Sequence, residues 1–143
     1  MVHSCIPEAS IEDYAGRLRF NKAEQRVPLA GVLELTFRCN NRCMHCYVNK
    51  GADDGRERKK ELSYDQMCRI LDAIAEEGCL WLLLTGGEPF IRRDFVEIYT
   101  YAKRRGFLIT LFTNGTLIDP EIADFLREWP PRSIEITLYG MSE

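Results

Sequence analysis

Apolar residues recur along the chain in two alternating patterns, short continuous runs and helical stripes. Between the runs, three segments place apolar residues at i, i+3, i+4 and i+7, which indicates helices with one buried face. Short runs that are apolar on both faces are typical of buried parallel strands. We expect strands at residues 32–37, 80–85, 107–112 and 134–138. The order β-α-β-α-β-α-β with short connections predicts an α/β fold in which four parallel strands are joined by right-handed crossovers.

The predicted helices have clear start and stop positions. Ser63, followed three residues later by Gln66, has the pattern of a capping box. Asp94 is expected to cap the second helix, and Asp119 precedes a proline in the first turn of the third. Glycine or proline ends each helix, at Gly78, Gly106 and Pro130.

Two segments do not follow this alternation. Residues 1–27 contain one apolar stripe behind Ser10, so we expect an N-terminal helical segment there and a core domain over residues 28–143. Residues 50–61 are rich in glycine and in charges of both signs, which predicts a solvated, mobile loop. A substrate lid is the alternative interpretation of that loop.

Distinctive sequences follow each predicted strand. In a parallel sheet the carboxyl ends of the strands form one edge, and ligands bind there. A cysteine-rich stretch at residues 39–46 follows the first strand and Gly-Gly-Glu-Pro at residues 86–89 follows the second. Thr-Asn-Gly at residues 113–115 follows the third strand, and Tyr-Gly at residues 139–140 follows the fourth. The topology therefore predicts that these motifs meet.

Cys39, Cys43 and Cys46 have the spacing C-x3-C-x2-C. Thiolates are soft, anionic ligands for metals and iron–sulfur clusters. A four-iron cluster held by three of them keeps one iron open. A structural zinc site with His45 as fourth ligand is the alternative, but adjacent His45 and Cys46 would struggle to reach one tetrahedral ion. A disulfide framework fits poorly, because three of the six cysteines are crowded into eight residues.

The second motif combines backbone freedom with a negative charge. Gly86 and Gly87 permit a sharp turn that brings backbone carbonyls close to a ligand. Glu88 adds a carboxylate, which suits an ammonium group rather than a phosphate. An ordinary glycine-rich turn with a solvent-facing Glu88 is the alternative. Thr113, Asn114 and Thr137 could bind the polar end of a small molecule or satisfy local turns.

Composition excludes some classes of function. The chain has 143 residues, the length of one domain, and a net charge of -3, which gives no case for binding nucleic acid or an anionic membrane. The longest apolar run, residues 79–84, is far shorter than the roughly 20 residues of a membrane helix. The first residues do not resemble a signal peptide, so a cytoplasmic protein is expected.

Together, the cysteine motif, Gly-Gly-Glu-Pro and Thr-Asn-Gly resemble the radical S-adenosylmethionine (SAM) superfamily over residues 29–141. The resemblance implies a partial (β/α) barrel and a 4Fe–4S cluster on Cys39, Cys43 and Cys46, with SAM chelating the open iron. Reductive cleavage of SAM would give a 5′-deoxyadenosyl radical that abstracts hydrogen, using electrons from a donor such as ferredoxin or flavodoxin. The cofactor-binding residues that it implies are Gly86, Gly87, Glu88, Pro89, Thr113, Asn114 and Thr137.

Within that superfamily, Cys-Asn-x-x-Cys-x-His-Cys-Tyr and Ile-Glu-Ile-Thr-Leu-Tyr-Gly are similar to the SPASM-type branch, which modifies peptides or proteins. A peptide or protein substrate is therefore expected. The family often has an aromatic residue where this chain has His45. The family core also has more strands than the four predicted here, so we expect a C-terminally incomplete core that is weakly active or inactive alone. A remnant that binds a cluster without turnover, and a non-catalytic zinc module, are the alternatives.

Overall fold

The computed structural model describes residues 27–138. Four parallel strands form a sheet in the order β1-β4-β5-β6. Their bounds are β1 (Ala30–Glu34), β4 (Trp81–Thr85), β5 (Leu108–Thr113) and β6 (Ser133–Ile136). This arrangement confirms the predicted α/β fold with four parallel strands. The expected helix behind Ser10 lies outside the described residues, so the division at residue 27 stays a prediction.

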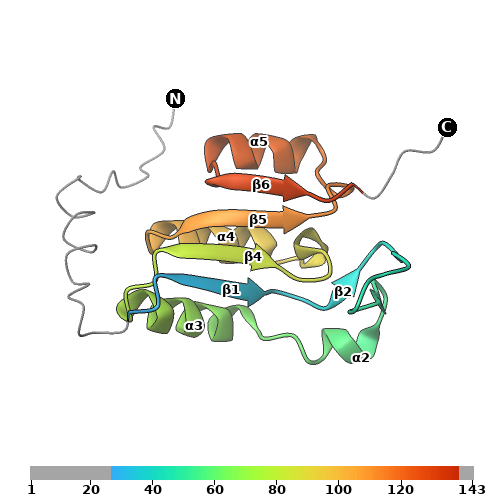
Figure 1. Ribbon diagram of the computed structural model, residues 1–143, viewed down its shortest axis with the longest axis horizontal. Helices are drawn as coiled ribbons and strands as arrows, with labels where there is room; N and C mark the ends of the chain where they lie inside the picture. The colour runs from blue at the N-terminus through green and yellow to red at the C-terminus, as the bar shows by residue number, and fades with distance from the viewer. Residues whose placement is uncertain (1–26, 139–143) are drawn as a thin grey trace.

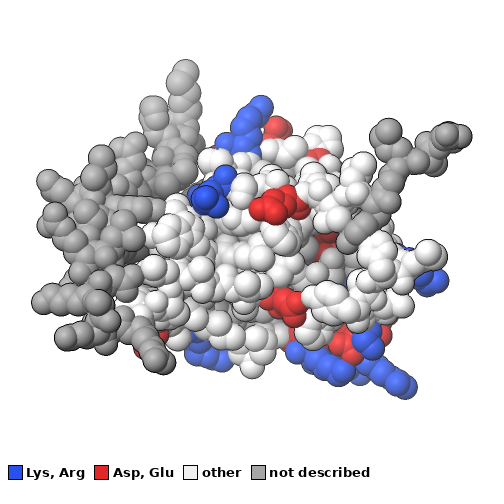
Figure 2. Space-filling model, in the orientation of Figure 1, with Lys and Arg blue, Asp and Glu red and all other residues white. Residues whose placement is uncertain are grey.

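Helices cover one face of the sheet. Helix α3 (Tyr64–Glu76) connects β1 to β4, α4 (Phe95–Arg104) connects β4 to β5, and α5 (Pro120–Glu128) connects β5 to β6. In Figure 1, α3 and α4 lie behind the sheet, and no helix of the described part crosses the face toward the viewer. Figure 2 shows that few charged side chains lie on this open face. Its apolar residues include Val32 and Phe112, which are 66% and 39% exposed.

The core lies between the sheet and the helices. In β4 and β5 alternate residues are buried, as the two-residue period of a strand requires. The predicted stripe of α4 is confirmed, since its four members are each 2% exposed or less: Phe95, Ile98, Tyr99 and Ala102. The Tyr99 hydroxyl donates a 2.7 Å hydrogen bond to the Trp129 carbonyl at the end of α5. This packing fixes the helices against the strands whose carboxyl ends carry the motif loops.

The capping predictions are confirmed at two helices and wrong at the third. Ser63 and Gln66 form a complete capping box at α3. The Asp119 carboxylate accepts a 2.8 Å hydrogen bond from the Ile122 amide at α5. Asp94 stands before α4 but does not cap it, because its carboxylate is bound by Arg92 at 2.9 and 2.7 Å.

Residues 50–61 are mostly exposed, as their composition predicted, but they are not an irregular loop throughout, and their mobility stays a prediction. They contain β3 (Lys50–Gly51) and a short helix α2 (Gly55–Arg58). Asp54 caps α2 by accepting hydrogen bonds from two backbone amides at 2.9 and 3.0 Å. Glu57 is 9% exposed and pairs with Lys60 at 2.7 Å. Some charges of this segment are therefore used in local contacts, while Arg56, Arg58 and Lys59 are exposed to solvent.

Candidate functional site

The cysteine loop, residues 39–50, is closed at its base by a short strand pair. Strand β2 (Arg38–Cys39) pairs in parallel with β3, so that Arg38 is opposite Lys50 and Cys39 is opposite Gly51. Of the predicted first strand, residues 32–37, only residues 32–34 lie in β1, and residues 35–37 connect β1 to β2. Within the loop the Cys46 amide donates to the Cys43 carbonyl at 3.1 Å, which forms a turn between these two cysteines.

The sulfur atoms of the loop accept hydrogen bonds from nitrogen donors. The amide of Asn41 lies 3.4 Å from Cys39 Sγ, and the amide of Asn49 lies 3.5 Å from Cys46 Sγ. The side-chain amide of Asn114 lies 3.7 Å from Cys39 Sγ. All three loop cysteines are free thiols and partly exposed. Within residues 27–138, however, no three Cys, His, Asp or Glu side chains converge closely enough to hold one metal ion.

Gly86 and Gly87 bring the turn after β4 against the segment that leads into the cysteine loop. A Cβ atom at Gly86 would lie 2.3 Å from the Thr36 carbonyl oxygen, and one at Gly87 would lie 2.4 Å from that of Arg38. The Gly87 amide donates to the Thr36 carbonyl at 2.7 Å, and the Glu88 amide donates to the Arg38 carbonyl at 2.9 Å. The glycines are therefore needed for contact with the chain's own backbone. Their contact with a ligand stays a prediction.

Glu88 is completely buried, so the alternative of a solvent-facing Glu88 is wrong. Its carboxylate accepts from the Phe90 amide at 3.2 Å and from the Asn114 amide at 2.8 Å. The Thr113 hydroxyl lies 2.8 and 2.9 Å from the two carboxylate oxygens. Glu88 thus joins the loop after β4 to the end of β5. It also lies beside the cysteine loop, because its backbone amide donates a hydrogen bond to the Arg38 carbonyl.

A second set of polar contacts links the Thr-Asn-Gly loop to the cysteine loop. Asn114 Nδ2 donates to Asn40 Oδ1 at 2.9 Å, and Asn40 Nδ2 donates to the Thr116 hydroxyl at 2.8 Å. The Thr116 hydroxyl in turn donates to Asn114 Oδ1 at 2.6 Å. Three loops from three strand ends are therefore bonded to one another. Thr137, directly after β6, is exposed, while Pro89 is buried where it begins the 3-10 turn η1 (Pro89–Ile91).

The sequence profile of the radical SAM superfamily matches residues 33–143. This chain belongs to the radical SAM superfamily. Members of this family are enzymes that use a 4Fe–4S cluster and SAM. The carboxyl-edge loops described above carry the motifs that gave the resemblance.

Three relatives illustrate the range of the match. Fe-coproporphyrin III synthase of Methanosarcina barkeri is 37% identical over 126 residues, which cover 88% of this chain and 30% of that protein. Mycofactocin maturase MftC of Mycolicibacterium smegmatis is 34% identical over 113 residues, 79% of this chain and 28% of the relative. PqqA peptide cyclase of Bradyrhizobium diazoefficiens is 32% identical over 117 residues, 82% of this chain and 30% of the relative. The chain therefore spans less than a third of these relatives.

The donor set of this radical SAM chain fits a 4Fe–4S cluster. Three thiols on one loop are the ligand type that such clusters require, and N–H donors directed at the sulfurs are one of the features that tune them. Within the described residues, His45 and Cys46 belong to no group of three ligands placed to hold a single zinc ion. No helix within residues 27–138 has the length and apolar character to span a bilayer.

Sequence reasoning missed several residues of this candidate site. Asn40 lies within the cysteine motif and Thr116 follows Thr-Asn-Gly, and their position at the same sheet edge was the available signal. Arg38 and Glu61 carried no motif signal, since a single arginine and a single glutamate are common in any chain. Tyr47, directly after Cys46, is 87% exposed, and its hydroxyl donates to the Glu34 carboxylate at 3.1 Å. That hydrogen bond raises the pKa of Tyr47, so its phenol stays protonated.

Proposed function

We propose that this chain forms the part of a radical SAM enzyme that binds the cluster and SAM, with Cys39, Cys43 and Cys46 as the cluster ligands. One observation carries the proposal: the three motif loops are hydrogen-bonded together at the carboxyl edge of a parallel sheet. The Glu88 amide contacts the Arg38 carbonyl, and the Asn114 side chain contacts Cys39 Sγ. Ligands of open α/β sheets bind at this edge.

The loop between β2 and β3 supplies the cluster ligands. The thiols of Cys39, Cys43 and Cys46 would each bind one iron of the cluster and leave the fourth iron open for SAM. Held by these thiols, the cluster would supply the electron for reductive cleavage of SAM, the chemistry on which hydrogen abstraction from the substrate would depend. The protein itself would bind and orient SAM and the substrate, and it would exclude water from them.

Glu88 is the residue proposed to receive the amino group of SAM. A carboxylate has acceptor capacity for about four hydrogen bonds. The amides of Phe90 and Asn114 and the hydroxyl of Thr113 supply three donors, which leaves one acceptor position. Gly86, Gly87 and Pro89 would fix that carboxylate. Thr113, Asn114 and Thr137 would provide the remaining polar groups of the SAM site.

The substrate and partners are proposed at the level of chemical class. The likeness to PqqA peptide cyclase, together with the run from Cys39 to Tyr47, supports a peptide or protein substrate. The likeness to Fe-coproporphyrin III synthase makes a porphyrin the competing substrate class. A low-potential donor such as ferredoxin or flavodoxin would supply the electron. A cytoplasmic location would keep the loop thiols reduced.

Anaerobic reconstitution of the 143-residue chain with iron and sulfide tests this proposal. We expect about four iron and four sulfide per chain, the content of a [4Fe–4S] cluster. Cys43→Ser should lose most of that iron, whereas Cys68→Ser, on helix α3 outside the loop, should keep it. Tight zinc binding without iron uptake would support the zinc module instead. Equal iron in both variants would refute the assignment of the ligands.

A further inference from the structure

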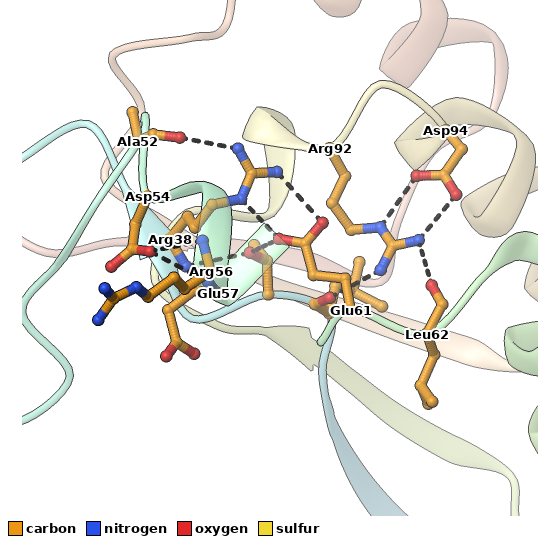
Figure 3. A network of polar contacts seen from close by, with 11 residues as sticks. Arg38, Ala52, Asp54, Arg56, Glu57, Glu61, Leu62, Arg92 and Asp94 are labelled. Atoms are coloured by element: carbon orange, nitrogen blue, oxygen red, sulfur yellow. Dashed lines mark hydrogen bonds and ion pairs between the residues drawn. The ribbon is translucent and has the colours of Figure 1, made fainter. Parts of the chain in front are cut away.

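A buried polar network stands next to the cysteine loop and connects it to the segment before α3. Arg38, the residue before Cys39, is 8% exposed. Its Nε and Nη2 atoms bind the two oxygens of the Glu61 carboxylate at 2.7 and 3.2 Å, and its Nη1 atom donates to the Ala52 carbonyl at 2.8 Å. Figure 3 shows the Arg38 guanidinium reaching both partners. One side chain thus joins β2 to segments on both sides of α2.

The backbone of Arg38 is fixed as firmly as its side chain. Its amide donates to the Thr36 hydroxyl oxygen at 3.0 Å, and its carbonyl accepts from the Glu88 amide at 2.9 Å. The Thr36 hydroxyl in turn donates to Glu61. Thr36, Arg38 and Glu61 therefore form a closed set of contacts, which determines where Cys39 begins the loop.

Arg92 anchors the other side of the network. It is 5% exposed, and its guanidinium donates to the carbonyls of Leu35 and Leu62 at 3.0 and 2.9 Å while it pairs with Asp94. These contacts hold the residue after β1 and the residue after Glu61 at fixed positions. Figure 3 shows the Arg92 guanidinium between Asp94 and Leu62. Glu61 is therefore presented to Arg38 by a segment that is itself held in place.

The strand pair at the base of the loop is too short to close it alone. Strands β2 and β3 contribute two residues each, and even a longer isolated two-stranded ribbon is marginal in water. A bidentate pair between arginine and carboxylate adds fixed geometry as well as attraction. A buried ion pair adds little to the free energy of unfolding, because removing both charges from water is costly. We therefore take the Arg38–Glu61 pair to fix a local arrangement.

We propose that Arg38 and Glu61 are positioning residues that close the base of the cysteine loop and hold Cys39 ready to share one cluster with Cys43 and Cys46. The inference rests on the proposed function, in which these cysteines are the cluster ligands. Arg38 and Glu61 act through the loop and do not themselves touch the cluster.

The test compares iron retention by variants of the 143-residue chain against increasing chelator. Arg38→Met and Glu61→Gln should weaken retention by about 10- to 100-fold, the range for residues that orient metal ligands. Arg38→Lys should retain more iron than Arg38→Met but less than the wild type, because a lysine can pair with Glu61 but cannot hold the Ala52 carbonyl at the same time. The remaining reduced cluster of Arg38→Met should give a broadened electron paramagnetic resonance signal, which reports an altered ligand geometry.

Two control variants separate positioning from general loss of stability. Tyr99→Phe removes a buried hydrogen bond at the α4–α5 end, so it should lower the melting temperature while retaining iron like the wild type. Arg127→Met removes an exposed pair with Asp124 and should change neither property. The proposal would be overturned if Arg38→Met and Glu61→Gln retained iron like the wild type. It would also be overturned if Tyr99→Phe lost as much iron as those two variants.

Thiol alkylation of the cluster-free chain tests the loop without the cluster. Opening of the base predicts faster modification of Cys39 in Arg38→Met than in the wild type, with the rate at buried Cys79 unchanged. If the wild type takes up no iron but Cys39 reacts faster in the variant, the proposed function fails while closure of the loop by Arg38 stands. Equal rates at Cys39 would refute the closure itself.

Discussion

The buried carboxylate of Glu88 should stabilise the chain even when no cofactor is bound. Glu88 is completely buried and accepts hydrogen bonds from the Phe90 amide, the Asn114 amide and the Thr113 hydroxyl. Glu88→Gln keeps the size of the side chain but replaces one oxygen by an NH2 donor. Whichever way the amide is oriented, its NH2 group faces a backbone N–H that then has no acceptor.

The magnitude follows from these contacts. One buried N–H without an acceptor costs about 1–3 kcal/mol, and the surviving bonds lose their charge-assisted strength, which costs about 1 kcal/mol more. We therefore expect Glu88→Gln to lower the free energy of unfolding of the cluster-free chain by about 2–4 kcal/mol. With a urea m-value of about 2 kcal/mol per molar, the middle of the usual range for small proteins, the midpoint should fall by roughly 1–2 M.

Urea denaturation followed by circular dichroism measures this change. Glu76→Gln, at an exposed position of α3, is the matched control and should stay within about 0.5 kcal/mol of the wild type. A Glu88→Gln midpoint equal to that of the control would mean that the carboxylate does not make these contacts in solution. In a double-mutant cycle with Thr113→Val, we expect a coupling energy of about 0.5 kcal/mol or more.

Three further predictions concern the scaffold. Gly86→Ala should destabilise the chain by about 2–3 kcal/mol, because its Cβ would lie 2.3 Å from a backbone oxygen. Gly55→Ala is the control and should not destabilise the chain, because a Cβ there has no atom within 4 Å. Chemical denaturation of the two variants measures the difference. Tyr99→Phe should cost about 0.5–1.5 kcal/mol in the same assay, since it removes a partly buried hydrogen bond to the Trp129 carbonyl. The Arg92 guanidinium holds the pKa of Asp94 below its usual range, so its stabilising contribution is present above about pH 4 and is lost as the pH falls through the lowered value. Urea midpoints between pH 2 and 6 should therefore fall less steeply in Asp94→Asn than in the wild type, and parallel curves would show that the pair contributes nothing.

The periodicity of the chain was sufficient to predict the sheet and its helices. Each predicted strand run overlaps an observed strand, and the capping box at Ser63 forms as expected. These features depend on residues close in sequence, so they can be read from the pattern. Strand ends differ by a few residues because pairing partners, such as the Thr85 carbonyl that accepts from the Leu35 amide, are distant in sequence.

The polar contacts that fix the site could not be predicted in this way. Composition made residues 50–61 appear solvated, yet Glu61 is bound by Arg38, 23 residues away in sequence. The same limit applies to Asp94, whose cap-like position in the sequence conceals its pairing with Arg92. Glu88 was recognised from its motif, but its bonds to Thr113 and Asn114 depend on the tertiary arrangement.

The most direct test of the central claim is the electron paramagnetic resonance spectrum of the reduced, reconstituted chain, recorded with and without SAM. If three cysteines hold the cluster and leave one iron open, then SAM must bind that iron and change the g-values of the signal. The account predicts such a change in the wild type and a much smaller one in Glu88→Gln at the same SAM concentration. A spectrum that is identical with and without SAM would contradict it.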